Sequence, residues 1–211
     1  MVRQRVRIRF SKQGDLRFVG HRDVMRCFER WFRRADLPLS FSEGFHPKPR
    51  VTFPAPLAVG MEGLDEVMEL ELSASWTAET LRARLQRHSP PGIRLRSVDV
   101  LPPGTPKVRP RVFHYEVLLP PGPQADLADA VERLRAATSA IVPRSGGRAP
   151  VDVRPFLDAI ELHDGLLSMR ILVPASGGAS PGDVLSSLGR ANLPREGALI
   201  VRTAVEVNGC A

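Results

Sequence analysis

The chain opens with a stretch in which charged and apolar residues alternate. In RVRIRF (5–10), Val6, Ile8 and Phe10 share one face and the arginines share the other, which predicts a half-buried strand. Over residues 22–35 the apolar side chains instead recur every three or four positions. We therefore expect an amphipathic helix there, with basic residues on its outer face.

Three more extended segments and a second helix are expected in the first half of the chain. The strands are expected at 50–53, 66–72 and 93–101, and the helix over 77–88 with Thr77 as its N-cap. The resulting order of elements is β-α-β-β-α-β.

After the proline-rich segment LPPGTPKVRP (101–110), the same order recurs. The expected elements are a strand at 112–119, a helix at 125–137, strands at 156–162 and 166–173, a helix from the N-cap Ser180 to before Asn192, and a strand at 198–207. Between the two middle strands, Asp164-Gly165 is a hairpin signal.

These patterns predict an α+β protein made of two tandem ferredoxin-like (βαββαβ) units with antiparallel sheets. The expected organisation is a basic N-terminal domain over 1–101, a proline-rich linker over 102–110 and a C-terminal domain over 111–211. A single larger mixed sheet wrapped by all four helices is the alternative that the order of elements leaves open.

The net charge of +7 is concentrated at the start of the 211-residue chain. Residues 1–50 hold 13 Lys and Arg against 5 Asp and Glu, whereas residues 51–211 hold 17 against 18. Such segregation is typical of a face that binds a polyanion. The sequence has no apolar run long enough to span a bilayer and no signal-peptide pattern at its start, so we expect a cytoplasmic protein with no membrane partner.

The arginines of the first strand are one candidate for this face. If the apolar side of the strand packs on helices, Arg5, Arg7 and Arg9 emerge on the open sheet, where guanidinium groups suit the phosphates of structured RNA. No aromatic pair accompanies them on the strands, so base stacking by the sheet is not expected. Alternatively, these arginines pair with Glu69 and Glu71 on a neighbouring strand.

The loop SEGFHPKPR (42–50) is a second candidate. Its prolines restrict the backbone while His46, Lys48 and Arg50 alternate outward, an arrangement that preorganises three donors for phosphate groups. His21, just before the expected helix, could approach this loop, and the two histidines would then suit acid–base cleavage of RNA. The alternative is that His21 caps the helix and His46 stabilises the turn.

The residues expected to contact RNA are Arg5, Arg7, Arg9, Lys12, Arg17, His21, Arg22, Arg26, His46, Lys48 and Arg50. The sequence contains no nucleotide-binding, nucleophile-elbow or metallopeptidase motif, so we expect no catalytic residue, metal or organic cofactor. The two cysteines, Cys27 and Cys210, are too few for a four-thiolate zinc or iron–sulfur site.

The run from Arg7 to Gly60 resembles the opening block of the radical SAM-linked family, a domain family of unknown function. The shared features are R-x-R-F-S-K-x-G-x-L-R-F, a helix start with histidine and aspartate, and G-F-x-P-x-P-[KR]; Gly20 and Arg22 stand where the family pattern has serine and leucine. Members are typically encoded beside, or fused to, a radical SAM enzyme. The resemblance therefore implies such an enzyme as a partner, and an accessory role in RNA or ribosome-related modification. Radical chemistry would belong to that partner, because this chain has no cysteine triad for a cluster.

Three functional hypotheses are open at this point. The first is a non-catalytic RNA-binding accessory protein that acts with a radical SAM enzyme. The second is a metal-independent endoribonuclease resembling CRISPR RNA-processing proteins, with His21 or His46 as the base and Lys48 or Arg50 beside the developing charge. The third is a protein-interaction module in which the proline-braced segment 45–60 docks a partner.

Overall fold

A computed structural model describes residues 4–122, 124–144, 146–175 and 177–208 of the chain. The described residues form two compact units. The first unit contains the residues up to Arg109 together with Asn208, and the second contains Pro110–Val207. Each unit combines two α-helices with antiparallel strands, so the expected mixed α+β class is confirmed.

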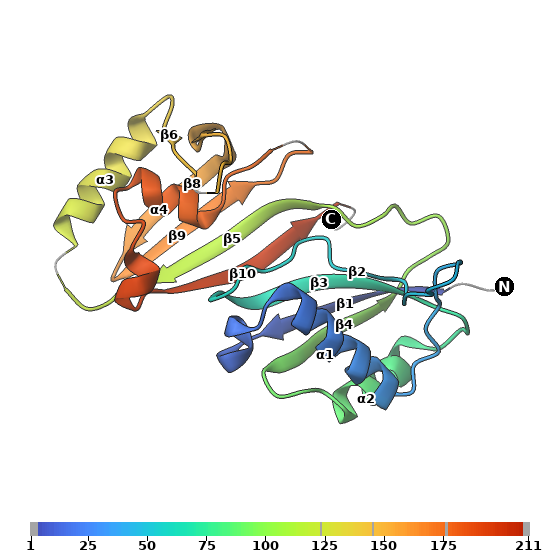
Figure 1. Ribbon diagram of the computed structural model, residues 1–211. Helices are drawn as coiled ribbons and strands as arrows, with labels where there is room; N and C mark the ends of the chain where they lie inside the picture. Colours follow the sequence, from blue (N-terminus) through green and yellow to red (C-terminus); the bar gives the residue numbers. More distant parts are fainter. Residues whose placement is uncertain (1–3, 123, 145, 176, 209–211) are drawn as a thin grey trace. The chain divides into compact units, whose positions relative to one another are not determined.

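The first unit alternates strands and helices in the order expected from the sequence (Figure 1). Its elements are β1 (Gln4–Lys12), η1 (Gly14–Phe18), α1 (His21–Arg34), β2 (Val51–Thr52), β3 (Glu62–Leu72), α2 (Ala78–Arg87) and β4 (Ile93–Val100). In its sheet, β1 lies between β4 and β3, and β2 pairs with β3. All of these pairings are antiparallel.

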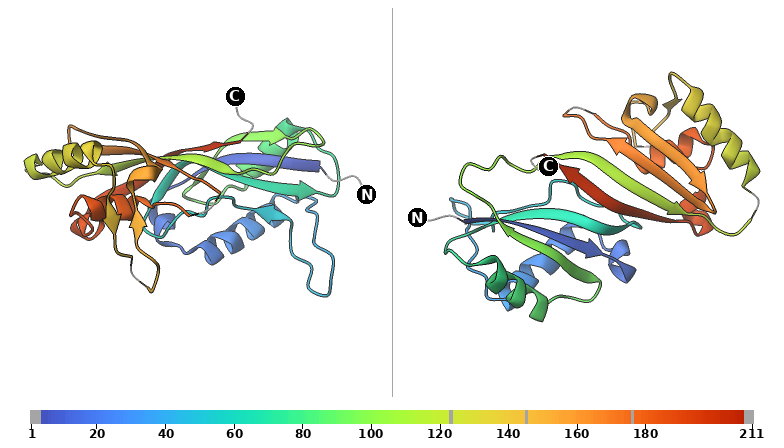
Figure 2. Two further views of the ribbon diagram at one scale, coloured as in Figure 1. Left: turned by 90° about the horizontal axis from the view of Figure 1, so that it is seen from above. Right: turned by 180° about the vertical axis from the view of Figure 1, so that it is seen from behind.

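One face of this sheet is covered by the two helices. Val6 and Ile8 of β1 are fully buried in a single hydrophobic core with Phe28 and Trp31 of α1 and Leu85 of α2. Side chains alternate between the two faces of a strand, so the arginines of β1 lie on the face opposite this core. Further views of the sheet and its helices are given in Figure 2.

A polar contact inside this core joins the two helices. Trp31 Nε1 of α1 donates a hydrogen bond of 2.9 Å to the Leu85 carbonyl of α2, which satisfies the one polar group of a fully buried indole. The hydroxyl of Thr77 accepts a hydrogen bond from the backbone N–H of Thr80, so the expected N-cap of α2 is confirmed.

The second unit repeats this order of elements with one insertion. Its elements are β5 (Pro110–Leu118), α3 (Ala125–Ala136), β6 (Ile141–Val142), β7 (Val151–Asp152), η2 (Arg154–Phe156), β8 (Leu157–His163), β9 (Leu166–Leu172), α4 (Pro181–Ser187), η3 (Leu193–Glu196) and β10 (Leu199–Val207). The main sheet has the order β10-β5-β9-β8, again with antiparallel pairing throughout, while β6 and β7 pair with each other. In the first unit β1 lies between β4 and β3, and in the second unit β5 correspondingly lies between β10 and β9. In each unit, then, the first main strand lies between the fourth and the third.

Every helix and strand expected from the sequence is present, although several ends shift. The hairpin signal is confirmed: Asp164 and Gly165 join β8 to β9 with φ angles of 45° and 80°, the left-handed conformation that a tight hairpin turn requires. The β6–β7 pair was not expected, because two-residue strands leave no alternation to detect.

Candidate functional site

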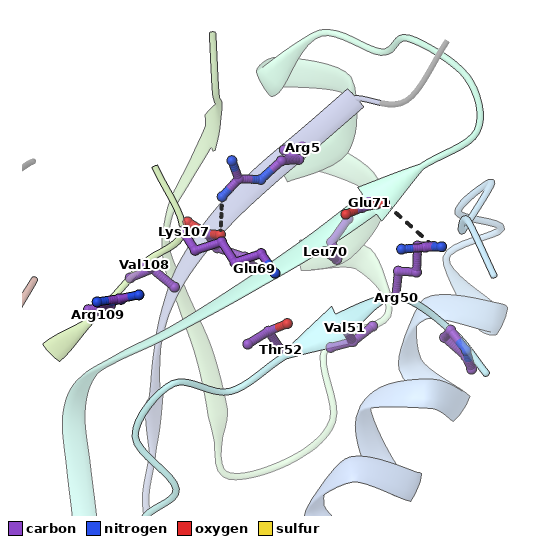
Figure 3. A pocket seen from close by; sticks show the side chains of 11 residues that line it. Arg5, Arg50, Val51, Thr52, Glu69, Leu70, Glu71, Lys107, Val108 and Arg109 are labelled. Carbon is purple, nitrogen blue, oxygen red and sulfur yellow. Dashed lines mark hydrogen bonds and ion pairs between the residues drawn. The ribbon is translucent and has the colours of Figure 1, made fainter. Parts of the chain in front are cut away.

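A pocket of about 380 Å³ lies on the helix-free face of the first unit's sheet (Figure 3). Its walls come from β1, β2, β3 and the segment that follows β4. The lining residues are Arg5, Pro49, Arg50, Val51, Thr52, Glu69, Leu70, Glu71, Lys107, Val108 and Arg109. The volume falls within the range of small-molecule and phosphate-group sites in proteins.

Two of the lining residues, Arg5 and Glu69, belong to an ion-pair network between β1 and β3. Glu69 Oε2 lies 2.6 Å from Arg5 Nη2, and Glu69 Oε1 accepts hydrogen bonds from Arg7 Nε at 3.1 Å and Arg7 Nη2 at 3.0 Å. Arg7 and Glu69 are each only 7% exposed. The Arg5 guanidinium also donates hydrogen bonds to the carbonyls of Thr105 and Pro106, in the segment that follows β4.

A second, looser ion pair lies at the loop side of the pocket. Arg50 Nε lies 3.7 Å from Glu71 Oε2, and the same nitrogen donates a hydrogen bond of 3.2 Å to the Phe41 carbonyl. Glu71 Oε2 is buried and accepts no hydrogen bond from the part of the chain that the structure describes. The Arg50–Glu71 interaction is therefore electrostatic, and Arg50 keeps donors for another anion.

The wall opposite β2 is the segment Lys107–Arg109, which is held by Asn208. The Asn208 side chain donates to the Lys107 carbonyl at 3.1 Å and accepts from the Arg109 N–H at 2.6 Å, and its backbone N–H donates to the Arg109 carbonyl at 3.0 Å. Val108 is buried, while the side chains of Lys107 and Arg109 are exposed. Among the described residues, neither of these two cationic groups has a hydrogen-bond or ion-pair partner.

Sequence reasoning missed these two cations because they fall within the expected linker. The available signal was the short alternation Lys107-Val108-Arg109, which has the period of an extended segment with one buried side chain. The prolines on both sides concealed it.

The charge of this pocket favours an anionic ligand. Its lining includes four cationic side chains, Arg5, Arg50, Lys107 and Arg109, against the two carboxylates Glu69 and Glu71. Arg7 shares Glu69 with Arg5, so the positive excess is larger than the lining residues alone suggest. Arginine and lysine donors fixed around a concave surface are the usual means of holding a phosphate group.

Three other residues expected to contact RNA also lie in or near the first unit's sheet. Arg9 Nη1 pairs with Asp65 at 2.6 Å, and Arg17 Nη1 pairs with Glu62 at 3.3 Å. Lys12 is buried, with Nζ 3.5 Å from the Val19 carbonyl. The arrangement of the strand arginines therefore matches the cross-strand pairing that was considered as the alternative to an open basic face.

The remaining expected RNA contacts are more exposed. Arg22 and Arg26 lie on the outer face of α1, and Arg26 Nη1 contacts Asp23 at 3.2 Å. His46 and Lys48 are exposed in the 42–50 loop.

His21 is the first residue of α1, and its ring packs edge-on against Phe53 with centroids 5.8 Å apart. Gly20 is the N-cap, so His21 does not cap the helix through its side chain. Neither His21 nor His46 makes a side-chain hydrogen bond to any described residue, and neither lines the pocket.

The described residues contain no group of three or more His, Cys, Asp or Glu side chains that could hold a metal ion. Within the same residues, no helix is both long and apolar enough to cross a membrane.

Comparison with known proteins gives a family but no activity. The model of the family DUF2344, described as an uncharacterized protein conserved in bacteria, matches residues 5–181. No curated protein matches the chain. Among solved structures, the chain is similar to a crystal structure of an unknown protein from Galdieria sulphuraria, with 15% sequence identity, 98% of this chain and 99% of that chain covered, and a TM-score of 0.31. At this TM-score the likeness supports no statement about fold or function.

Proposed function

The chain belongs to the DUF2344 family, an uncharacterized family conserved in bacteria, and we propose that it is a non-catalytic RNA-binding accessory protein that acts with a radical SAM enzyme. The ligand we propose for the pocket on β1 and β3 is a backbone phosphate of RNA. RNA offers many phosphates in series, so a basic chain segment can add contacts on either side of this pocket.

The observation that carries the RNA-binding part is the unbalanced charge of the pocket. Lys107 and Arg109 have no anionic partner among the described residues, and Asn208 fixes the backbone that bears them. Preorganised donors lose less conformational entropy on binding than donors on a free loop. Exposed basic residues of α1 and of the 42–50 loop supply further positive charge in the same unit.

The radical SAM part rests on the resemblance of residues 7–60 to the radical SAM-linked family. With two cysteines in 211 residues, this chain offers too few thiolates to bind a [4Fe–4S] cluster by itself. A role as an accessory protein that holds RNA beside a cluster-bearing enzyme would account for both the family resemblance and the basic pocket.

We also propose that each unit is a ferredoxin-like unit. The support is the order of strands, in which the first lies between the fourth and third and the second pairs with the third, with helices after the first and third strands. The β6–β7 pair is then an insertion between the first helix and the second main strand of the C-terminal unit.

The RNA-binding proposal is tested by titrating the purified protein with a labelled single-stranded RNA at several salt concentrations. We expect a steep loss of affinity with salt. The double variant Lys107→Ala/Arg109→Ala should bind more weakly, with the slope of log K against log salt reduced by about 0.7 for each phosphate contact that is lost. The control is Arg133→Ala/Arg195→Ala, which removes the same charge from two exposed positions of the second unit and should keep the parent's slope.

Two results would overturn the RNA-binding proposal. One is a parent protein that binds RNA no better at low salt than at high salt, and the other is an equal effect of the two double variants. Cleavage of the RNA during the titration, abolished by His21→Ala/His46→Ala, would instead favour the endoribonuclease.

The partner is tested separately by crosslinking in cells followed by mass spectrometry. We expect a crosslinked enzyme that carries a three-cysteine cluster motif. Recovery of RNA crosslinks with no such enzyme would remove the radical SAM part of the proposal and leave RNA binding in place.

A further inference from the structure

A narrow arm formed by residues 41–49 extends away from the sheet of the first unit (Figure 2). Its base is held by backbone and side-chain contacts: the Ser42 N–H donates to the Lys48 carbonyl at 2.8 Å, and the Lys48 N–H donates to the Ser42 hydroxyl at 3.0 Å. Phe41 and Pro49 form an isolated β-bridge just below these contacts. The arm is thus a closed loop on a fixed stem.

The tip of this arm presents an aromatic ring to solvent. Phe45 is fully exposed, whereas Phe10, Phe28 and Phe32 of the same unit are almost fully buried. Gly44, with φ of 119°, allows the bend that places Phe45 at the tip, since few side chains tolerate this conformation. An exposed phenylalanine forgoes about 1.5–3 kcal/mol of burial, and its position on a fixed stem leaves the ring accessible to a ligand.

The chemistry around Phe45 favours a nucleic acid over an apolar protein surface. His46 and Lys48 are both exposed on the arm, and its C-terminal end runs directly into Pro49 and Arg50, which line the basic pocket. Hydrophobic protein docking sites are contiguous apolar patches, and the exposed polar residues Glu43, His46 and Lys48 interrupt such a patch here. An aromatic ring with a basic side chain, Lys48, on the same arm matches a nucleobase and the phosphate attached to it.

We propose that Phe45 is a stacking platform for one unpaired base of a bound RNA strand. This inference rests on the proposed RNA-binding function and adds to it that the bound RNA is single-stranded at this point. Duplex RNA cannot use the platform, because its bases are already stacked on each other.

The test compares three proteins on two ligands by fluorescence anisotropy: the parent, Phe45→Leu and Phe45→Trp, each with a single-stranded oligoribonucleotide and with a duplex of the same length. Leucine keeps the apolar character of the position and removes the aromatic face. We expect Phe45→Leu to lose about 5- to 150-fold in affinity for the single strand and less than about 2-fold for the duplex, with Phe45→Trp close to the parent on both. The salt slope should be the same in all three proteins, because no phosphate contact changes.

An exposed apolar residue of the second unit, Ile141, provides the control for a general loss of surface hydrophobicity, and Ile141→Ala should bind like the parent. Equal binding of the single strand by Phe45→Leu and the parent overturns the stacking role while RNA binding stands. A parallel loss on single strand and duplex also overturns it, because stacking cannot act on the duplex. If the parent binds neither ligand, the proposed function fails and this inference fails with it.

Discussion

The two units of this protein share an order of strands but differ in the charge on corresponding strands. In the first unit, β1 carries Arg5, Arg7 and Arg9 on the face opposite its buried side chains. The corresponding positions of β5 in the second unit, on the face opposite the buried Tyr115 and Val117, carry Val112, His114 and Glu116. Two sheets with the same strand order therefore present faces of different charge, and strand order alone does not determine function.

The pockets on these two faces show the same contrast. The pocket of the second unit, about 230 Å³ in volume, is lined by Arg170 and His114 but also by Glu116 and Glu161. Arg170 is engaged by Asp158 at 2.7 Å and by Glu206 at 3.7 Å. An anion would be repelled by these carboxylates, so the RNA contact that we propose is assigned to the first unit alone.

Each unit also has a well-buried ion pair, but at a different place. In the first unit it is Arg7–Glu69, on the sheet face. In the second it is Arg144–Asp183 at the start of α4, with contacts of 3.1 and 2.7 Å. Asp183 also forms a capping box with Ser180, so this pair stabilises a helix end.

The largest effect is expected from breaking the pair on the sheet face. Glu69→Ala would leave the buried Arg7 guanidinium without its carboxylate, at a cost of about 3 kcal/mol in the free energy of unfolding. Asp65→Ala removes the ion-pair partner of Arg9. Because the Arg9–Asp65 pair is more exposed than Arg7–Glu69, this change should cost about 1 kcal/mol or less. Urea unfolding gives both values, and peptide-resolved hydrogen exchange should place the loss in the first unit. Equal losses of unfolding free energy in the two variants would show that burial does not make the Arg7–Glu69 pair more stabilising than the Arg9–Asp65 pair.

An intermediate and pH-dependent effect is expected at Asp183. Burial disfavours its carboxylate, but hydrogen bonds from Arg144 and Ser180 and the charge of Arg144 outweigh burial and lower the pKa of Asp183. Its stabilisation is therefore complete above the unfolded-state pKa of about 4 and is lost as the pH falls through the lower folded-state pKa. Asp183→Asn should cost about 2 kcal/mol at pH 7.

Urea unfolding of the parent and Asp183→Asn at pH 7 and near pH 2 checks this dependence. The difference between the two proteins should shrink at the acid end. Asp158→Asn, at an exposed pair with Arg170, provides the matched control and should change little at either pH. A difference that grows on acidification would mean that the pKa of Asp183 is raised in the folded protein.

The smallest effect is expected at the exposed face of the second unit. His114 Nε2 lies 2.6 Å from Glu206 Oε1, but both side chains are substantially exposed, and surface pairs contribute at most about 1 kcal/mol. His114→Gln should therefore change the urea midpoint only slightly and leave RNA affinity within about 2-fold of the parent. A large loss of RNA affinity would break the assignment of binding to the first unit.

Much of the fold could be read from local patterns. The alternation in residues 5–10, the helical period after Arg22 and the turn at Asp164-Gly165 each depend on neighbouring residues, and the structure confirms all three. Strand ends were less accurate: β3 begins at Glu62, before its alternation becomes regular.

The candidate site was harder to predict, because its residues meet only through tertiary pairing. Cross-strand pairing of the β1 arginines with Glu69 and Glu71 was considered, and Glu69 does pair with Arg5 and Arg7, but which arginine meets which carboxylate was not predictable. Arg5 lies opposite Glu71 in register and instead contacts Glu69, while Arg50 from a distant loop contacts Glu71. The exposure of Phe45 was equally hard to predict, since an irregular loop has no periodic pattern that separates buried from exposed positions.

The clasp between Asn208 and the Lys107–Arg109 backbone has a consequence for how the protein is made. Residue 208 is added by the ribosome only after all of the second unit has been synthesised, so the wall of the basic pocket obtains its hydrogen bonds from Asn208 only after that point. A nascent chain that has completed its first hundred residues already has the strands and helices of the first unit. It does not yet have the hydrogen bonds from Asn208, and under the proposed function phosphate binding at this pocket would wait until the second unit has been synthesised.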